Sequence, residues 1–338
     1  MQFSIFVNKF KNMAKNINSI KLPVQEELSY FDEFLKSTLK TDNFILDQTL
    51  KYIFKTKGKQ IRPLLVLLSA KLIGEVNTKT YIAATLIELL HTATLVHDDI
   101  VDNSELRRSF FSLKSLWKSK ITVLVGDYLL SQGLLLSIEN NAFDVLKVVS
   151  EAVNNMSKGE LLQIEKARKI NLSLESYFEI IGMKTASLIK ASTKCGAISV
   201  TEDKYVIDKI AEIGWNIGIA FQIKDDLFDY ETTKIIGKPG GNDIQEGKIT
   251  LPVIYCMEEM SKKEQRQFLK MFTKKHKSDS DIKSIQRIII DSNAIKSAKK
   301  TMFEYSNKSK KILYDNFKCS SVYSNYDELI DFIIERKK

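Results

Sequence analysis

Apolar residues recur at helical spacing along most of the chain. Between Tyr81 and Val96, apolar side chains return every three or four residues, so they form one broad stripe on a helix. A half-buried strand would instead alternate apolar and polar residues, and the sequence shows no such alternation. The same helical pattern predicts helices over residues 26–40, 63–73, 121–138, 142–166, 173–198, 205–230 and 250–260. We therefore predict an all-α fold.

The composition favours one large helical domain over several small ones. The chain has 338 residues, of which 44% are hydrophobic, and it contains only 13 Gly and 4 Pro. These residues are too few for the many tight turns of an all-β fold, and no stretch rich in Pro, Gly or Ser suggests a linker. We predict a single domain over 1–338, with irregular segments at 103–114 and 231–249 and a more variable helical part over 261–338. Its lysine-rich stretch 261–284 predicts a solvated helix pair.

Two segments bear on targeting and membranes. Residues 1–22 are basic but lack arginine and a long apolar core, so we interpret them as an N-terminal extension rather than a targeting peptide. Residues 121–138 are long enough to span a bilayer, but Asp127 and Gln132 interrupt them, which favours a buried core helix. The three cysteines are far apart and form no CxxC pair, as is typical of reduced thiols. We therefore expect a cytoplasmic protein without a membrane span.

The net charge of +9 suggests an anionic partner. Only seven of the 51 basic residues are arginine, and the lysines are interspersed with acids. Nucleic-acid readers are normally rich in arginine, and the chain carries no recognisable nucleic-acid-binding motif. We therefore exclude nucleic acid and keep a phosphorylated small molecule as the expected anion.

Two aspartate clusters carry the clearest chemistry. HDDIVD at 97–102 and KDDLFD at 224–229 both read DDxxD and both follow apolar helical runs. Positions i and i+4 share a helix face, so carboxylates at this spacing repel each other unless a cation lies between them. Oxygen ligands without His or Cys suit a hard ion such as Mg²⁺. An exposed acidic helix end could explain one cluster, but two together predict a paired metal site.

Basic residues accompany both clusters. Arg107 and Arg108 follow the first cluster and present two planar forks that suit phosphate oxygens, although they could also simply neutralise nearby acids. GKQIRP at 58–63 places Lys59 and Arg62 beside the start of a helix, where backbone amides favour anions. His91 lies seven residues before Asp98 and so faces the same side of its helix. The glycine-rich segment GKPGGNDIQEGK, with Lys238 and Lys248, could be a lid over a polyphosphate or a plain surface loop.

In this order, GKQIRP, ELLHTATLVHDDIVDNSELRR, GDYLL, GELLQ, KTASLI, FQIKDDLFDY and GKPGGNDIQEGKITLP resemble the motifs of the trans-isoprenyl diphosphate synthases, or polyprenyl synthetases. The resemblance covers about residues 45–260 and is greatest to long-chain bacterial members of the hexaprenyl, heptaprenyl and octaprenyl type. It implies an isoprenoid-synthase fold, with helices around a central cavity. It also implies a prenyltransferase that condenses isopentenyl diphosphate with an allylic diphosphate by ionisation, condensation and elimination.

The resemblance also implies roles for individual residues. Three Mg²⁺ ions, for which Mn²⁺ could substitute, would bind the allylic diphosphate, with Asp98, Asp102 and Asp225 as metal ligands. The full aspartate motifs would be Asp98, Asp99 and Asp102, and Asp225, Asp226 and Asp229. Isopentenyl diphosphate would contact Lys59, Arg62, His91 and Arg108. Arg107, Lys184, Lys238 and Lys248 would neutralise the allylic diphosphate, and Thr185 and Gln222 would line the reacting end.

Small residues precede the first motif, at the positions that set product length. Ala93 and Thr94 lie one turn below Asp98, and Leu90 lies a further turn down. Short-chain members of the family carry bulky aromatic residues near the first two positions, so the resemblance implies a longer tunnel, with a floor near Leu134 and Leu135. We predict a product longer than C20, about C30 to C40 at one isoprene unit per helical turn. Ala93 and Thr94 could alternatively serve only close helix packing.

Three alternatives to a long-chain synthase remain at this point. A terpene cyclase would not need the second diphosphate site that GKQIRP and the arginine pair suggest. A short-chain, geranylgeranyl-type synthase and a non-catalytic subunit of a heteromeric synthase also share the resemblance, although the intact motifs disfavour the second. The resemblance implies a homodimer, to which residues 121–138 could contribute the interface. It implies at most peripheral membrane contact, through the lipid product, and the product would serve quinone side chains.

Overall fold

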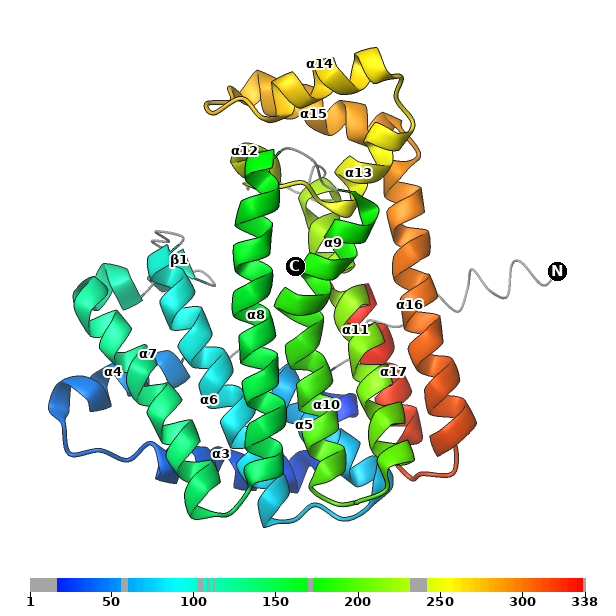
Figure 1. Cartoon of the computed structure of the whole chain (residues 1–338). Helices are drawn as coiled ribbons and strands as arrows, with labels where there is room; N and C mark the ends of the chain where they lie inside the picture. Colours follow the sequence, from blue (N-terminus) through cyan, green and yellow to red (C-terminus); the bar gives the residue numbers. More distant parts are fainter. Residues whose placement is uncertain are drawn as a thin grey trace. The chain divides into compact units, whose positions relative to one another are not determined.

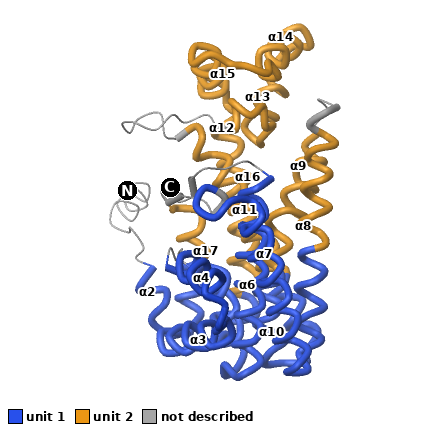
Figure 2. Tube along the Cα trace, turned by 90° about the vertical axis from the view of Figure 1, so that its left-hand side faces the viewer, with its two compact units in different colours: residues 1–153, 191–211, 315–329 blue, residues 154–190, 212–314, 330–338 orange. Residues whose placement is uncertain are grey.

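The computed structural model describes residues 17–55, 60–101, 106–107, 110–111, 113–169, 173–231 and 242–336. Almost all of this chain is helical, as the apolar pattern predicts (Figure 1). The exception is a pair of short antiparallel strands of two residues each, β1 (Leu106–Arg107) and β2 (Phe110–Phe111). They lie in the segment expected to be irregular. The fold class is therefore all-α. Residue contacts divide the chain into two compact units, each assembled from separate segments (Figure 2).

The first unit comprises residues 1–153, 191–211 and 315–329. At its centre, α5 (Ile61–Ile73) is buried on all sides from Pro63 to Ala70, and α6 (Thr78–Val101) packs against it. Pro63 lies in the first turn of α5, where its missing N–H costs nothing. The strands β1 and β2 also lie in this unit, and its other helices are α2 (Ile17–Lys21), η1 (Leu22–Val24), α3 (Gln25–Thr38), α4 (Phe44–Lys55) and α7 (Leu113–Glu139).

The second unit comprises residues 154–190, 212–314 and 330–338. A buried apolar cluster that includes Phe268, Phe272, Ile285 and Ile289 joins its peripheral helices. The lysine-rich stretch forms the expected helix pair, since a serine capping box starts each of its two helices. The elements wholly within this unit are α9 (Leu174–Ile181), η2 (Gly182–Ala186), α12 (Asn242–Glu246), α13 (Leu251–Glu258), α14 (Lys262–Phe272) and α15 (Asp279–Asp291).

In the part of the chain that the structure describes, five helices contribute residues to both units (Figure 2). The apolar pattern predicts the bounds of two of them, Phe143–Lys169 and Lys204–Glu231, to within a few residues, because each of these helices buries one face. The other three have no matching predicted range: one is part of the longer stripe expected over 173–198, and two lie in the variable helical part expected over 261–338. Three of the five are long, α8 (Phe143–Lys169), α11 (Lys204–Glu231) and α16 (Ala294–Phe317), and two are shorter, α10 (Ser187–Ile198) and α17 (Tyr323–Glu335).

Helix α7 differs from the buried core helix expected over 121–138. Val125 and Leu129 are buried, but Leu124, Leu134 and Leu135 are 57%, 44% and 48% exposed. In the described part of the chain, α7 is the one helix long and apolar enough to cross a membrane. In its most apolar 18-residue stretch, 39% is buried. A single helix of this kind carries little weight, because core helices of soluble proteins meet the same criterion. Leu134 and Leu135 lie at the surface of the chain, so they do not form an enclosed floor as expected.

Candidate active site

Glycine contacts bring the KTASLI segment close to the second aspartate motif. A Cβ on Gly218 of α11 would lie 2.5 Å from the Cα of Ala186, and a Cβ on Gly182 would lie 2.7 Å from the Trp215 ring. Only glycine permits so close an approach of α11 and η2. The segment η2 is a π-helix, a form that often marks functional positions, and it carries Lys184 and Thr185. Two expected site residues are thereby placed beside α11.

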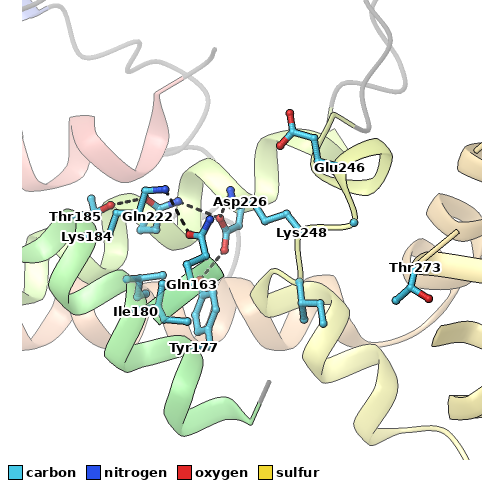
Figure 3. Close-up of a pocket in the computed structure, with 13 residues that line it drawn as sticks. Gln163, Tyr177, Ile180, Lys184, Thr185, Gln222, Asp226, Glu246, Lys248 and Thr273 are labelled. Atoms are coloured by element: carbon cyan, nitrogen blue, oxygen red, sulfur yellow. Dashed lines mark hydrogen bonds and ion pairs between the residues drawn. The ribbon is translucent and has the colours of Figure 1, made fainter. Parts of the chain in front are cut away.

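A chain of hydrogen bonds joins these residues to Asp226 (Figure 3). The Thr185 hydroxyl donates to Gln222 Oε1 at 2.7 Å, and Gln222 Nε2 donates to Asp226 Oδ1 at 3.1 Å. The other carboxylate oxygen, Oδ2, accepts a 2.6 Å hydrogen bond from the hydroxyl of Tyr177. Both Tyr177 and Asp226 are buried, at 3% and 1% exposure. Thr185, Gln222 and Asp226, each predicted to belong to the site, therefore form one network.

Lys248 reaches the same carboxylate from the end of α12. Gly247, at φ +71°, adopts the left-handed conformation that turns the chain after α12, and Lys248 follows it. The ammonium group lies 3.2 Å from Asp243 Oδ1 and 3.9 Å from Asp226 Oδ1. The amide N–H of Asp243 donates to Asp229 Oδ2 at 2.7 Å, which anchors α12 to the second motif. The motif thus positions the lysine that follows it by 19 residues (248 − 229).

Burial and charge shift the ionisation of this cluster. Burial raises the pKa of Asp226 to about 6, although Lys248 and the hydrogen bonds from Tyr177 and Gln222 act in the opposite direction. Burial alone would lower the pKa of Lys248, but Asp226 and Asp243 outweigh it, and the net shift is upward. Lys248 therefore carries its positive charge at neutral pH.

These residues line a cavity of about 230 Å³ within the second unit (Figure 3). Lys184 also lines it and forms an ion pair with Glu160 and a 3.4 Å hydrogen bond to Gln163. Ile180, Ile181 and Ile249 supply an apolar part of the wall. Two lysines, a hydroxyl and an amide beside apolar wall suit a ligand with an anionic head and an apolar body.

Asp225, the first aspartate of the second motif, pairs with Arg336, which is 111 residues away in sequence. Arg336 Nη2 donates to Asp225 Oδ1 at 2.5 Å, and the guanidinium carbon lies 3.7 Å from the centroid of the Phe221 ring. The Asp225 side chain remains 39% exposed, so part of it is accessible to a further ligand. Arg336, Tyr177 and Asp243 were not among the predicted site residues. Two of them had a sequence signal: Tyr177 lies seven residues, or two helical turns, before Lys184, and Asp243 lies within the glycine-rich segment GKPGGNDIQEGK.

In the first unit, Arg62 and His91 lie together. Arg62 Nη1 lies 2.9 Å from His91 Nε2, and because arginine can only donate, this nitrogen is the acceptor and the histidine is neutral. Both had been expected to contact one diphosphate. On the same helix as His91, α6, Ala93 and Leu90 are buried, and the Thr94 hydroxyl donates to the carbonyl of His91 at 2.8 Å.

The first aspartate motif is only partly described. Asp98 is exposed near the end of α6, and Asp99 is buried at 3% exposure. Lys59, Asp102, Arg108 and Lys238 lie outside the described residues, and only the backbone of Arg107 is described, in β1. In the described ranges, no three His, Cys, Asp or Glu side chains are grouped closely enough to form a metal site. Within its own unit, each of Asp98 and Asp225 offers carboxylate oxygens, the ligands that a hard divalent ion prefers.

Comparisons with known proteins agree with these motifs. The family model described as polyprenyl synthetase matches residues 43–289. Heptaprenyl diphosphate synthase component 2 from Bacillus subtilis (strain 168) is 31% identical over 267 residues, which are 78% of this chain and 76% of that protein. The chain therefore belongs to the polyprenyl synthetase family. It is a prenyltransferase.

Solved structures show the same fold. The polyprenyl synthase from Caulobacter crescentus CB15, complexed with calcium and isoprenyl diphosphate, has a TM-score of 0.87 and 29% identity; the match covers 97% of this chain and all of that chain. Geranylgeranyl pyrophosphate synthetase from Pyrococcus horikoshii Ot3 has a TM-score of 0.86 and 29% identity, over 95% of this chain and 99% of that chain. The fold is therefore shared by enzymes whose names denote different products.

Proposed function

We propose that this prenyltransferase condenses isopentenyl diphosphate head-to-tail with an allylic diphosphate and repeats the addition to make a long all-trans polyprenyl diphosphate. The cavity of the second unit carries the proposal: it combines Lys184, Lys248 and the Thr185–Gln222–Asp226 network with apolar wall. An allylic diphosphate has the matching chemistry, with an anionic head and an apolar chain.

A divalent ion, with Mg²⁺ as the ion we propose, fits the aspartate motifs. Asp98, Asp102 and Asp225 would hold three ions, and Mn²⁺ could replace them. When bound, the ions would withdraw charge from the leaving diphosphate and so promote cleavage of the allylic C–O bond. The hard oxygen ligands of both motifs support this choice over a soft metal. The complex of the Caulobacter relative with calcium supports a divalent ion in general.

The cationic side chains would act on the two diphosphates separately. Lys184 and Lys248 would neutralise the leaving diphosphate together with Arg107 and Lys238. Arg62 and His91, which lie 2.9 Å apart, would bind the diphosphate of isopentenyl diphosphate with Lys59 and Arg108. Holding the second substrate in this way would place its double bond against the allylic carbon.

The neutral groups would protect the reacting end of the allylic chain. Thr185 and Gln222 present oxygen atoms that can face a developing positive charge, and their mutual hydrogen bond fixes their orientation. The apolar wall of Ile180, Ile181 and Ile249 would exclude water, which would otherwise add to the cationic carbon. The released diphosphate would take the proton that completes the elimination.

The small residues of α6 support a long product. Ala93 carries only a methyl group, and this small side chain is the support, because Ala93 and Leu90 one turn below it are both buried and line no open tunnel in this structure. We propose a product of about C30 to C40, at one isoprene unit for each turn of helix that the tail passes. A geranylgeranyl-type product is the alternative. The floor of the tunnel would lie at residues other than the exposed Leu134 and Leu135.

The exposed apolar side chains of α7 support association with a second chain. Leu124, Leu134, Leu135 and Ile138 are each 44% to 57% exposed. A homodimer through this face is our proposal, for a cytoplasmic enzyme that contacts membranes only through its lipid product and serves quinone side chains. The word "component" in the name of the Bacillus relative raises the alternative of a heteromeric partner.

One assay separates these possibilities. The purified chain would be incubated with Mg²⁺, labelled isopentenyl diphosphate and farnesyl diphosphate, and the products separated by chain length. Formation of products longer than C20 would support the proposal. Products ending at C20 would favour the geranylgeranyl alternative, and no product would favour a subunit that needs a partner. Light scattering on the same sample would distinguish a homodimer from a monomer.

A further inference from the structure

We propose that Tyr177 is a positioning residue, which holds the Asp226 carboxylate away from Lys248 and thereby keeps this lysine available for the allylic diphosphate. The inference rests on the proposed function, because it assigns Lys248 to that diphosphate. Tyr177 itself contacts no reacting atom in this scheme and acts through Asp226.

The geometry around Asp226 leaves little freedom. Its two oxygens accept from different sides, Oδ2 from the Tyr177 hydroxyl at 2.6 Å and Oδ1 from Gln222 Nε2 at 3.1 Å. Together these hydrogen bonds fix the rotation of the carboxylate plane. A phenol hydroxyl on a carboxylate forms a short, strong hydrogen bond, and this one is shielded from water by burial of both residues.

Lys248 is the competing partner for the same carboxylate. Its ammonium group lies 3.9 Å from Asp226 Oδ1 but 3.2 Å from Asp243 Oδ1, so its closer contact is with Asp243. An ammonium ion and a carboxylate in a buried site attract each other strongly. Without the Tyr177 hydroxyl, Asp226 would lose one of its two neutral donors. The carboxylate would then be free to rotate toward Lys248 and form a closer ion pair.

The rotation would also disturb the reacting end. Asp226 can only accept, so it dictates that Gln222 presents Nε2 to it and Oε1 to Thr185. A carboxylate that turns toward Lys248 releases the Gln222 amide from this orientation. Tyr177 is therefore expected to influence two parts of the site, the cation that binds diphosphate and the oxygens that line the reacting end.

Tyr177→Phe removes only the hydroxyl and tests the proposal directly. We expect the KM for the allylic diphosphate to rise about tenfold, as for the loss of a hydrogen bond to a charged group, while the KM for isopentenyl diphosphate stays within about twofold. Calorimetric binding of inorganic pyrophosphate with Mg²⁺ should weaken by a similar factor. The matched control is Tyr326→Phe, which removes a buried hydroxyl that lies 3.0 Å from the neutral Ser69. It should lower the melting temperature without changing either KM.

A double-mutant cycle with Asp226→Asn shows whether Tyr177 acts through Asp226. Neutralising Asp226 removes its attraction for Lys248, so Tyr177→Phe should add less than about twofold to the loss in that background. Should the single variant Tyr177→Phe fail to fold, pyrophosphate binding by the double variant is compared with binding by Asp226→Asn alone, and the two should agree within about twofold. An equal loss in both backgrounds, or unchanged pyrophosphate binding in the single variant, would overturn the proposal. A wild-type chain that binds pyrophosphate but makes no prenyl product would instead contradict the proposed function.

Discussion

The guanidinium group of Arg336 lies 3.7 Å from the centroid of the Phe221 ring and donates a 2.5 Å hydrogen bond to Asp225. Arg336 follows directly on α17, while Phe221 and Asp225 lie one turn apart on α11. A planar guanidinium can stack on a ring and bind a carboxylate at the same time. The C-terminal end of the chain thus stabilises the part of α11 that carries the second aspartate motif.

Arg336→Lys should therefore destabilise the protein although it keeps the charge. Lysine cannot stack its charged group flat on Phe221, so we expect a loss of about 1–2 kcal/mol in the free energy of unfolding. Urea unfolding followed by circular dichroism measures the loss. Arg287→Lys is the control, because Arg287 is 83% exposed and its ion pair with Asp291 is at the surface. Equal stabilities of the two variants would contradict the role assigned to the stacking.

Asp98→Ala should abolish most of the activity without unfolding the chain. Asp98 is exposed and so contributes little to packing, but as a metal ligand it would stabilise charge on the leaving diphosphate. We expect turnover to fall by about 10²–10³. Turnover with labelled isopentenyl diphosphate should be measured over a range of Mg²⁺ concentrations and after EDTA.

Asp208→Ala is the matched control for this substitution, since Asp208 is an exposed aspartate on α11 outside both motifs. It should keep wild-type turnover. Full activity of Asp98→Ala, or of the wild type in EDTA, would exclude the metal site proposed for the aspartate motifs.

Much of the fold could be predicted from periodicity alone, because long helices that bury one face repeat their apolar residues regularly. The stripe over 205–230 corresponds closely to α11, Lys204–Glu231. The π-helix η2 was not predictable in this way. Its close approach to α11 depends on the contacts of Gly182 and Gly218 with Trp215 and Ala186, and local sequence does not reveal which distant residues meet.

The residues of the candidate site also divide into those that the sequence motifs predict and those that depend on tertiary contacts. Thr185, Gln222 and Asp226 were predicted from motifs, and the structure joins them in one network. Tyr177 and Arg336 were missed because their partners are 49 and 111 residues away in sequence. Such pairs arise from tertiary packing, so a motif can identify the aspartates but not the residues that orient them.

Gly218→Ala should separate α11 from η2. The new methyl group would lie 2.5 Å from the Cα of Ala186, and because this is a backbone atom the whole segment must shift. We expect a loss of about 1–3 kcal/mol in stability, as for an overpacked core, and a fall in turnover because Thr185 would move relative to Gln222. Gly74→Ala is the control: its methyl group would lie 3.5 Å from Val200 Cβ, an ordinary contact. If the stability of Gly218→Ala equals that of the wild type, close packing of α11 against η2 does not require glycine at this position.

The capping box of α15 should give a pH-dependent contribution to stability. Hydrogen bonds from Lys274 and from Ser278 lower the pKa of Asp281 to about 2. Because the folded pKa lies below the unfolded value of about 3.9, the contribution is present above pH 4 and is lost as the pH falls toward 2. Asp281→Asn should therefore lower the melting temperature at pH 6, and the difference from wild type should shrink below pH 4. A difference that is the same at pH 6 and pH 3 would rule out this ionisation as its cause.

Ala93→Phe should shorten the prenyl product. Ala93 is fully buried on α6, one turn below the residues of the first motif, and a benzyl group there would occupy the space through which the growing tail is proposed to pass. One helical turn is about 5.4 Å, close to the length of one isoprene unit, so the product should lose at least one five-carbon unit. Chromatography of the dephosphorylated products measures the distribution. Thr78→Phe places the same side chain at an exposed position at the start of the same helix and should leave the product length unchanged. If the Ala93→Phe enzyme is active and its products have the wild-type length, Ala93 serves only helix packing and the tunnel runs elsewhere.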